Sequence, residues 1–260
     1  MSRAGSGFAP EWPAPPNVRA WVTERGGAAR YGRLNLATHV GDDAHAVAAN
    51  RARLRVELEL PAEPVWLTQV HGARVLDLDS EAVAPADGSV TARAGVVCAV
   101  LTADCLPVVL CDRAGSRVGV AHAGWRGLLA GVLPAAVRAL GVSAGEVVAW
   151  LGPAIGPAAY EVGADVREPF VAQRAAAARS FAPNARGRWQ ADLYGLARDS
   201  LAAAGVRTIH GGELCTYTDA ARFFSHRREA PCGRMATLVW LAHRADHPAY
   251  PPGIRVEAES

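Results

Sequence analysis

Three short segments carry reactive side chains at the ends of apolar stretches: TQVHG at 68–72, LTADCLPVVLC at 101–111 and VAHAGWRG at 120–127. Each apolar stretch predicts a strand, which is a rigid base for the polar residue that ends it. His71, Cys105 and His122 together are ligand types that suit zinc, and copper less specifically. Three protein ligands leave a fourth position open, where a bound water has its pKa lowered to about 7 and acts as a nucleophile.

The same side chains can also work without a metal. Cys105 can be a nucleophile with His122 as its base, and Asp104 can orient the imidazole or act as an acid. Both interpretations need Cys and His within bonding range, so the spacing does not separate them. For each residue alone, a buried thiol or a histidine hydrogen-bonded to the backbone is the simpler alternative.

Arginine supplies the candidate anion site. All 27 residues counted as Lys or Arg are Arg, which excludes a Schiff-base lysine and a GxxxxGK[ST] phosphate loop. Arg126 leads into a predicted helix, and a helix N-terminus suits phosphate. Asn35 and Arg51 lie in or after the glycine-rich segment 26–41, where His39 could line a pocket. Arginine binds phosphate through its planar fork, although a solvated surface residue is the alternative for any single one. Three more arginines lie in or near FFSHRR, at Arg227, Arg228 and Arg234.

Composition limits the class of protein. The chain has 260 residues, of which 50% are hydrophobic, and this is enough to bury a sizeable core. A net charge of +2 is too near neutral to indicate nucleic-acid binding. No apolar run reaches the roughly 18 residues of a membrane span, and the N-terminus lacks the apolar region of a secretory signal. Five cysteines without a CxxC pair indicate reduced thiols, so we expect a cytoplasmic protein.

The elements that must position these residues mix strands and helices without strict alternation. This order predicts an α+β domain with mixed sheets rather than a doubly wound parallel sheet. We expect a Pro-rich leader at 1–17 and a single domain at 18–260. Predicted strands cover 18–23, 65–70, 74–79, 94–102, 107–111, 117–121, 147–151, 207–209 and 237–242. Predicted helices cover about 43–60, 127–140, 166–178 and 192–204.

A set of short segments in a fixed order carries a family resemblance. NLATHVGDD, TQVHG, LTADCLPVVL, AHAGWRG, GPAIGPAAYEV, CTYTD and FFSHRR run in family order over almost all of residues 18–242. With them the chain resembles the YfiH/YlmD family, the bacterial relatives of human FAMIN. Members have been labelled polyphenol oxidase of laccase type, peptidoglycan editing factor and purine nucleoside phosphorylase. The resemblance implies one catalytic domain with a four-layer α/β/β/α arrangement.

The resemblance also implies a site and an activity. His71, Cys105 and His122 become a metal triad, with zinc the expected ion and copper the alternative. The implied reactions are phosphorolysis of adenosine, inosine and S-methyl-5'-thioadenosine, with adenosine deaminase activity in addition. Phosphate and nucleoside contacts would fall on the positions already singled out for anion binding, and Asp104 is the expected proton carrier. These contact positions are Asn35, His39, Arg51 and Arg126.

Three alternatives stay open at this point. A copper-dependent polyphenol oxidase is weakened by Pro157-Ala158-Ala159, which stand where relatives often carry Cys. A Cys105-dependent hydrolase or amidase editing peptidoglycan precursors uses the same thiol. A module in which the triad holds a purely structural metal is the third. For the enzyme we expect a monomer whose partners are purine nucleosides and phosphate, without nucleic acid or membrane.

Overall fold

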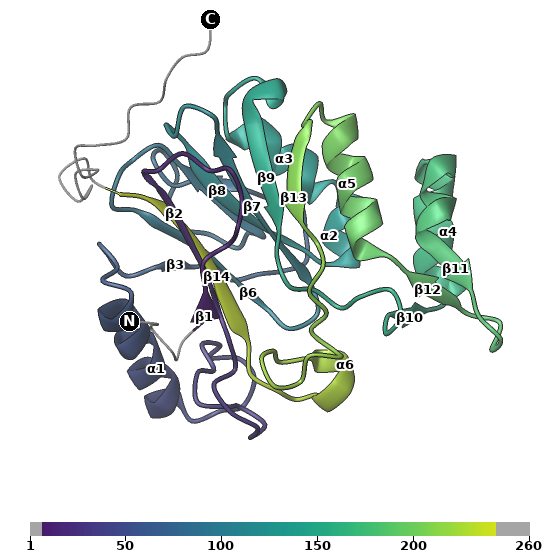
Figure 1. Cartoon of the computed structure of the whole chain (residues 1–260), viewed down its shortest axis with the longest axis horizontal. Helices are drawn as coiled ribbons and strands as arrows, with labels where there is room; N and C mark the ends of the chain where they lie inside the picture. Colours follow the sequence, from purple (N-terminus) through teal and green to yellow (C-terminus); the bar gives the residue numbers. More distant parts are fainter. Residues whose placement is uncertain (1–6, 243–260) are drawn as a thin grey trace, which may run out of the picture.

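Two β-sheets packed face to face form the centre of the computed structural model, which describes residues 7–242 (Figure 1). The five-stranded sheet has the order β1 (Gly7–Phe8), β2 (Val18–Thr23), β14 (Met235–Leu241), β6 (Val97–Thr102) and β3 (Val65–Trp66). The six-stranded sheet has the order β13 (Thr208–Gly211), β9 (Val147–Leu151), β7 (Leu106–Asp112), β8 (Val118–Ala123), β5 (Gly88–Thr91) and β4 (Leu76–Asp77). Both sheets contain parallel and antiparallel pairs, as predicted.

Helices cover the outer face of each sheet. On the five-stranded sheet lies α1 (Ala44–Glu57), which begins after the Asp43 cap. On the six-stranded sheet lie α2 (Trp125–Ala130), α3 (Val132–Ala139) and α5 (Leu193–Ala203), while a 3-10 turn (Ala144–Glu146) precedes β9. Side chains alternate along the strands: in β7, Val108 and Leu110 face the helices, whereas Val109 and Cys111 face the other sheet. This confirms the four-layer α/β/β/α arrangement.

A segment between β9 and α5 forms an excursion beside the helices (Figure 1). It consists of β10 (Glu161–Val162), α4 (Ala164–Gln173), a 3-10 helix (Ala175–Ser180), β11 (Phe181–Pro183) and β12 (Trp189–Ala191). The sequence predicts one helix over 166–178 here and no sheet. Strands of two or three residues are too short to show a period of two, which is why the small sheet escapes prediction.

Other boundaries also differ from the predictions. The helix expected over 127–140 is two helices, because Gly131 adopts φ +88° between α2 and α3. β1 lies within the stretch expected to be a leader, and Phe8 and Trp12 pack against the cluster between the sheets. The remaining leader residues, 1–6, and the end of the predicted domain, 243–260, lie outside the described residues. Within residues 7–242, no helix has the length and apolar character needed to cross a bilayer.

Candidate functional site

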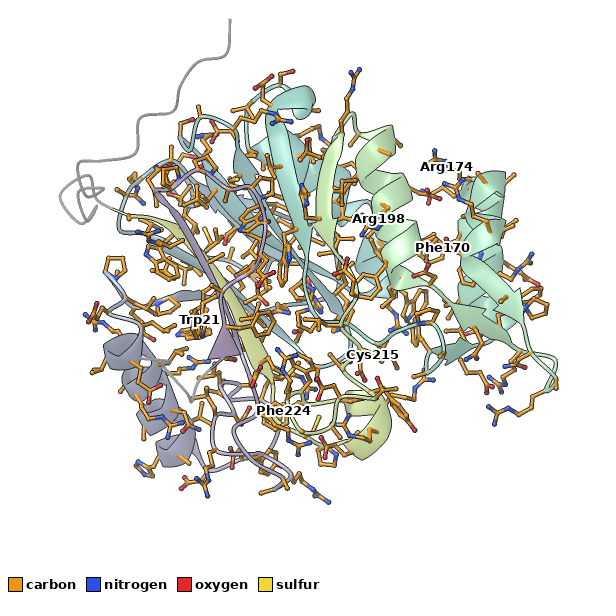
Figure 2. All side chains as sticks on the ribbon, viewed as in Figure 1. Trp21, Phe170, Arg174, Arg198, Cys215 and Phe224 are labelled. Atoms are coloured by element: carbon orange, nitrogen blue, oxygen red, sulfur yellow. The ribbon has the colours of Figure 1, made fainter. Side chains whose placement is uncertain are left out.

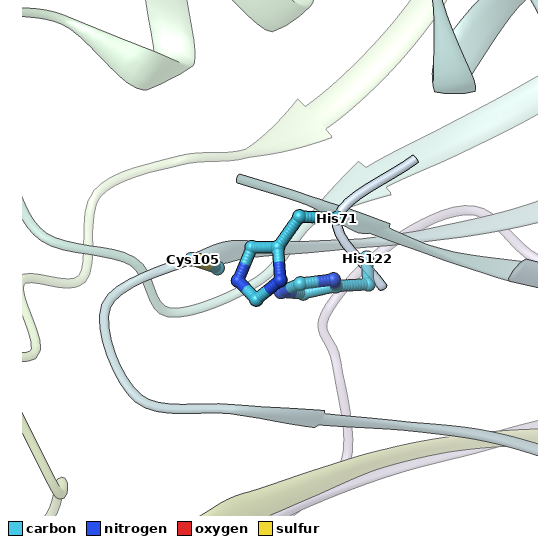
Figure 3. Close-up of side chains that lie close together, drawn as sticks. All are labelled: His71, Cys105 and His122. Carbon is cyan, nitrogen blue, oxygen red and sulfur yellow. The ribbon is translucent and has the colours of Figure 1, made fainter. Parts of the chain in front are cut away.

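His71, Cys105 and His122 converge where β7 begins and β8 ends, in the middle of the six-stranded sheet (Figure 3). His71 lies in the loop between β3 and β4, Cys105 in the tight connection between β6 and β7, and His122 within β8. Their ligand atoms lie within 4.8 Å of one another. The two imidazole rings meet edge to face, with their centroids 4.7 Å apart. We call these three residues the triad; the chain brings them together from positions up to 51 residues apart (71 to 122).

A buried carboxylate, Asp87, holds two of the triad residues in place. It is completely buried, and its oxygens accept hydrogen bonds from the backbone amides of Val70, His71 and Gly72. Its Oδ1 also lies 2.9 Å from Nδ1 of His122. Because an ionised carboxylate only accepts, Nδ1 of His122 carries the proton and Nε2 is left to bind a metal or the thiol. Asp87 therefore fixes both the loop of His71 and the ring of His122.

Cys105 and His122 form a tightly coupled pair. Burial by itself raises the pKa of the Cys105 thiol, but the neighbouring His122 and His71 outweigh it and lower that pKa to about 6. Burial opposes the charged form of His122, but Cys105 and Asp87 outweigh it and raise the pKa of the imidazole to about 9. Both directions favour a thiolate beside an imidazolium. A thiolate is the form of cysteine that binds metal and the form that attacks as a nucleophile.

The backbone around the triad is strained and closely packed. His71 and Asp104 adopt φ +60° and +85°, in the left-handed region that non-glycine residues seldom occupy. Asp104 is held there by the Thr216 hydroxyl at 2.6 Å and the Arg227 amide at 2.7 Å. A Cβ on Gly124 would lie 2.8 Å from Sγ of Cys105. Only a glycine at 124 therefore lets α2 begin this close to the thiol.

The triad opens into a cavity of about 350 Å³, which we call the triad cavity. Its other walls bring ionisable and aromatic side chains toward the triad. The guanidinium carbon of Arg227, in α6 (His226–Glu229), lies 5.3 Å from the centre of the Tyr160 ring. Six ionisable residues line the cavity beyond the triad: His39, Asp104, Tyr160, His226, Arg227 and Arg234.

Of the four predicted phosphate contacts, His39 lies at the triad cavity and the other three do not. Asn35 is completely buried, and its side-chain oxygen accepts the amides of Ala37 and Arg234. The Arg51 guanidinium donates to the Leu36 carbonyl and lies over Trp66, its carbon 4.2 Å from the ring centre.

Arg126 lies over the ring of its neighbour Trp125, with the guanidinium carbon 4.4 Å from the ring centre. The sequence shows that Asn35, Arg51 and Arg126 have polar or cationic side chains, but tertiary packing determines which way each side chain points. Asn35 thus supports the backbone of Arg234, and Arg234 is the residue that faces the cavity.

The donor set fits a metal ion. Imidazole nitrogen and thiolate sulfur are both ligand types of zinc in proteins, and a tetrahedral ion with bonds of about 2.0–2.3 Å holds its ligands about 3.3–3.8 Å apart. The observed limit of 4.8 Å needs a shift of about an ångström to close around an ion. Within residues 7–242 this ligand group has three members and faces a cavity, which is the composition of an open site rather than a closed structural one.

Several residues of the site gave no usable sequence signal. Asp87 stands alone between Ala86 and Gly88, and its partners are mainly backbone amides. Gln69 exchanges two hydrogen bonds with the backbone of Leu101, which ties the His71 loop to β6. Tyr160 differs from these two, because it lies in the GPAIGPAAYEV segment that carries the family resemblance.

Comparison with known proteins agrees with the resemblance. Residues 19–242 match a family model described as multi-copper polyphenol oxidoreductase laccase. A purine nucleoside phosphorylase of Pseudomonas aeruginosa is 54% identical over 236 residues, which cover 89% of this chain and 97% of the relative. Purine nucleoside phosphorylase YfiH of Escherichia coli is 49% identical over 237 residues, with the same coverage of 89% and 97%.

Solved structures show the same fold. The crystal structure of a Neisseria meningitidis protein classed as DUF152 has a TM-score of 0.87 at 44% identity, covering 92% of this chain and 100% of that one. YlmD from Geobacillus stearothermophilus has a TM-score of 0.81 at 30% identity, covering 92% and 99%. The chain therefore belongs to the YfiH/YlmD family, whose model bears the laccase description.

Proposed function

We propose that this protein is a purine nucleoside phosphorylase acting on adenosine, inosine and S-methyl-5'-thioadenosine. One observation carries the proposal: a single cavity joins the triad to two arginines, two further histidines and a tyrosine. Relatives 54% and 49% identical are named purine nucleoside phosphorylases, which supports it. The cavity volume of about 350 Å³ lies within the range of small-molecule sites.

Arg227 and Arg234 form the phosphate side of the site in this proposal. In phosphorolysis, a phosphate oxygen attacks the anomeric carbon of the sugar, the bond to the purine nitrogen breaks, and the proton of hydrogen phosphate ends on the departing base. The two guanidinium groups hold the anion by charge and hydrogen bonds. His39 and His226 offer further N–H donors on the same wall. Asn35 acts through Arg234, whose amide it binds.

Tyr160 and Asp104 complete the nucleoside side. The Tyr160 ring is an aromatic surface on which a purine can stack. Asp104 lines the cavity next to Cys105 and stays our prediction for the residue that carries a proton to or from the purine. Its bonds to Thr216 and Arg227 hold the carboxylate in one orientation. Because one of these bonds comes from the backbone amide of Arg227, Asp104 also links the purine side to the phosphate side.

The triad residues His71, Cys105 and His122 would hold the metal, which we propose to be zinc. Bound there, zinc would supply a Lewis acid at the wall of the cavity. The adenosine deaminase activity belongs to this part of the proposal. Asp87 would keep the imidazole of His122 in the ligating tautomer. A cytoplasmic monomer that binds neither nucleic acid nor membrane remains our prediction for the protein as a whole.

The deciding experiment measures metal and activity together. We expect wild type to carry about one zinc per chain and to release hypoxanthine from inosine only when phosphate is present. Cys105→Ala should lose both the metal and the activity. Arg234→Gln should raise the KM for phosphate at least tenfold, whereas Arg55→Gln, an exposed arginine on α1, should not. Hypoxanthine release without phosphate, or equal metal in wild type and Cys105→Ala, would contradict the proposal.

One geometric observation favours a second candidate, a Cys-dependent hydrolase or amidase. Cys105, His122 and Asp87 stand in the order nucleophile, base and orienting carboxylate. Covalent trapping of Cys105 in metal-free protein that keeps its activity would favour this candidate. A multicopper oxidase needs more ligands than the triad provides within the described residues, and oxygen uptake with a phenol after copper loading tests that activity.

A further inference from the structure

A second cavity, of about 480 Å³, lies among the helices on the outer face of the six-stranded sheet. We call it the helical cleft. One wall comes from α2 and α3, another from α5, and the third from α4 with the 3-10 helix that follows it. Figure 2 shows Phe170 on α4 and Arg174, which directly follows that helix, on the side toward α5. The helical cleft shares no lining residue with the triad cavity.

The interior of the helical cleft is apolar. Leu128, Val137, Phe170 and Leu196 come from four different helices and keep between 5% and 7% of their surface exposed. These side chains pack against the sheet or against one another on one side and line the cleft on the other. An apolar cavity of this size, enclosed by helices on three sides, is typical of a site for a small apolar molecule.

Positive charge lies at the rim. Arg138, in the last turn of α3, is exposed, and its guanidinium has no ion pair or hydrogen-bond partner among residues 7–242. The Arg174 guanidinium donates one hydrogen bond, to the Asp199 carbonyl at 3.0 Å, and forms no ion pair in the same range. The Asp199 carboxylate is already paired with Arg179. The rim thus carries two guanidinium groups that no carboxylate in the described part of the chain neutralises.

We propose that the helical cleft binds an amphipathic anion, a carboxylate with a hydrocarbon body. The apolar walls take up the hydrocarbon, and the carboxylate stays at the rim beside Arg138 and Arg174. An uncharged apolar molecule would leave the rim charges unused, and an anion without an apolar body would leave the interior unfilled. Both features of the cleft together select the amphipathic class.

Decanoate tests the proposal, with calorimetric titration as the readout. Wild type should bind one decanoate per chain, and Ser200→Phe, which places a ring in the cleft from α5, should abolish binding. Arg138→Gln should weaken decanoate at least threefold and leave the affinity for decanol unchanged. Arg55→Gln is the matched control, because Arg55 is likewise exposed in the last turn of a helix. Thermal unfolding verifies that each variant is folded.

Four results would overturn the proposal. The first is no decanoate binding at millimolar concentration, and the second is equal decanoate affinity in wild type and Arg138→Gln. The third is decanol binding as tightly as decanoate, which would assign the cleft to an uncharged ligand. The fourth is a dimer in sedimentation that Ser200→Phe dissociates, which would assign the cleft to a second copy. Because Arg138 is exposed, its variant keeps the test valid even where Ser200→Phe does not fold.

Discussion

The triad cavity lies where strands end, whereas the helical cleft lies between helices. The cavity has the smaller volume, about 350 Å³ against about 480 Å³, yet it holds the buried polar groups. His122 lines the cavity, is 3% exposed and is bonded to the completely buried Asp87, while the two arginines of the cleft, Arg138 and Arg174, are exposed. Buried polar groups are costly unless every partner is in place, so their presence marks a site built for chemistry. Size alone marks only room for a ligand.

The largest expected effect is a loss of folding stability when a leucine of the helix layer is shortened. The loss should be larger where the leucine packs on the sheet than where it lines the helical cleft. Leu133 is completely buried against the sheet, whereas Leu129 is half-buried and lines the helical cleft. Leu133→Ala should lower the free energy of unfolding by about 3 kcal/mol because it leaves a cavity in the core. Leu129→Ala should cost about 1 kcal/mol, because one side of that residue already faces open space. Urea unfolding measures both, and equal losses would show that the cleft is closed in solution.

Asp87→Asn should lower zinc affinity by about 10- to 100-fold, measured by competition with a chelating dye. Each carboxylate oxygen accepts two N–H groups, so an amide nitrogen at either position faces two donors. The ring of His122 and the loop of His71 then lose their common anchor. The control is Asp79→Asn, since Asp79 also accepts several bonds, from Thr91, Ala92 and Arg93, but belongs to neither cavity. Unchanged zinc affinity in Asp87→Asn would show that His71 and His122 keep their ligating positions without the carboxylate.

Gly124→Ala should lower zinc affinity by about tenfold through steric contact alone. The backbone at Gly124 has φ −69° and ψ 168°, which alanine adopts freely. The added Cβ would approach Sγ of Cys105 to 2.8 Å and a ring carbon of His71 to 3.4 Å, so the thiol must move. Gly145→Ala is the matched control because nothing lies within 4 Å of its Cβ position. Equal affinities of the two variants would mean that the thiol can give way without cost.

Sequence patterns predict an element correctly where residues close together in the sequence determine its conformation. Strands β7 and β8 lie within two residues of the strands predicted at 107–111 and 117–121, and α1 begins next to the start predicted near residue 43. Four layers came from the family resemblance, because the packing of two sheets depends on contacts between distant segments. Residue types at the ends of apolar segments grouped His71, Cys105 and His122 as a candidate ligand set, and the resemblance then implied that they are a metal triad.

The parts that escaped prediction depend on long-range packing. Arg51 and Arg234 look alike in sequence, and both guanidinium groups donate to backbone carbonyls, Arg51 to Leu36 and Arg234 to its neighbours Cys232 and Gly233. Only Arg234 lines the triad cavity, whereas Arg51 lies over Trp66. Asp87 binds backbone amides, which leave no mark in the residue types of their segment. A side chain whose partners are main-chain groups far along the chain is the kind of functional residue that one sequence cannot reveal.

The smallest expected effect is a pH dependence that starts at the cavity wall. Partial burial, with the charges of Arg234 and Arg51, holds the pKa of His39 below its ordinary value of 6.5. Between the folded pKa and 6.5 the unfolded chain binds more protons at this residue, so His39 contributes a loss of stability as pH falls through that window. His39→Gln removes this contribution, by less than about 1 kcal/mol because the charges are partly exposed.

The measurement is the difference in Tm between His39→Gln and wild type at pH 7 and pH 5. We expect the variant to gain on wild type as the pH falls, since only wild type then has to place a proton beside two arginines. His45→Gln, at an exposed position on α1, corrects for loss of an imidazole as such. If the Tm difference between His39→Gln and wild type does not change with pH, Arg234 and Arg51 do not face His39 in solution. The proposed phosphate side would then lose the pairing of His39 with Arg234.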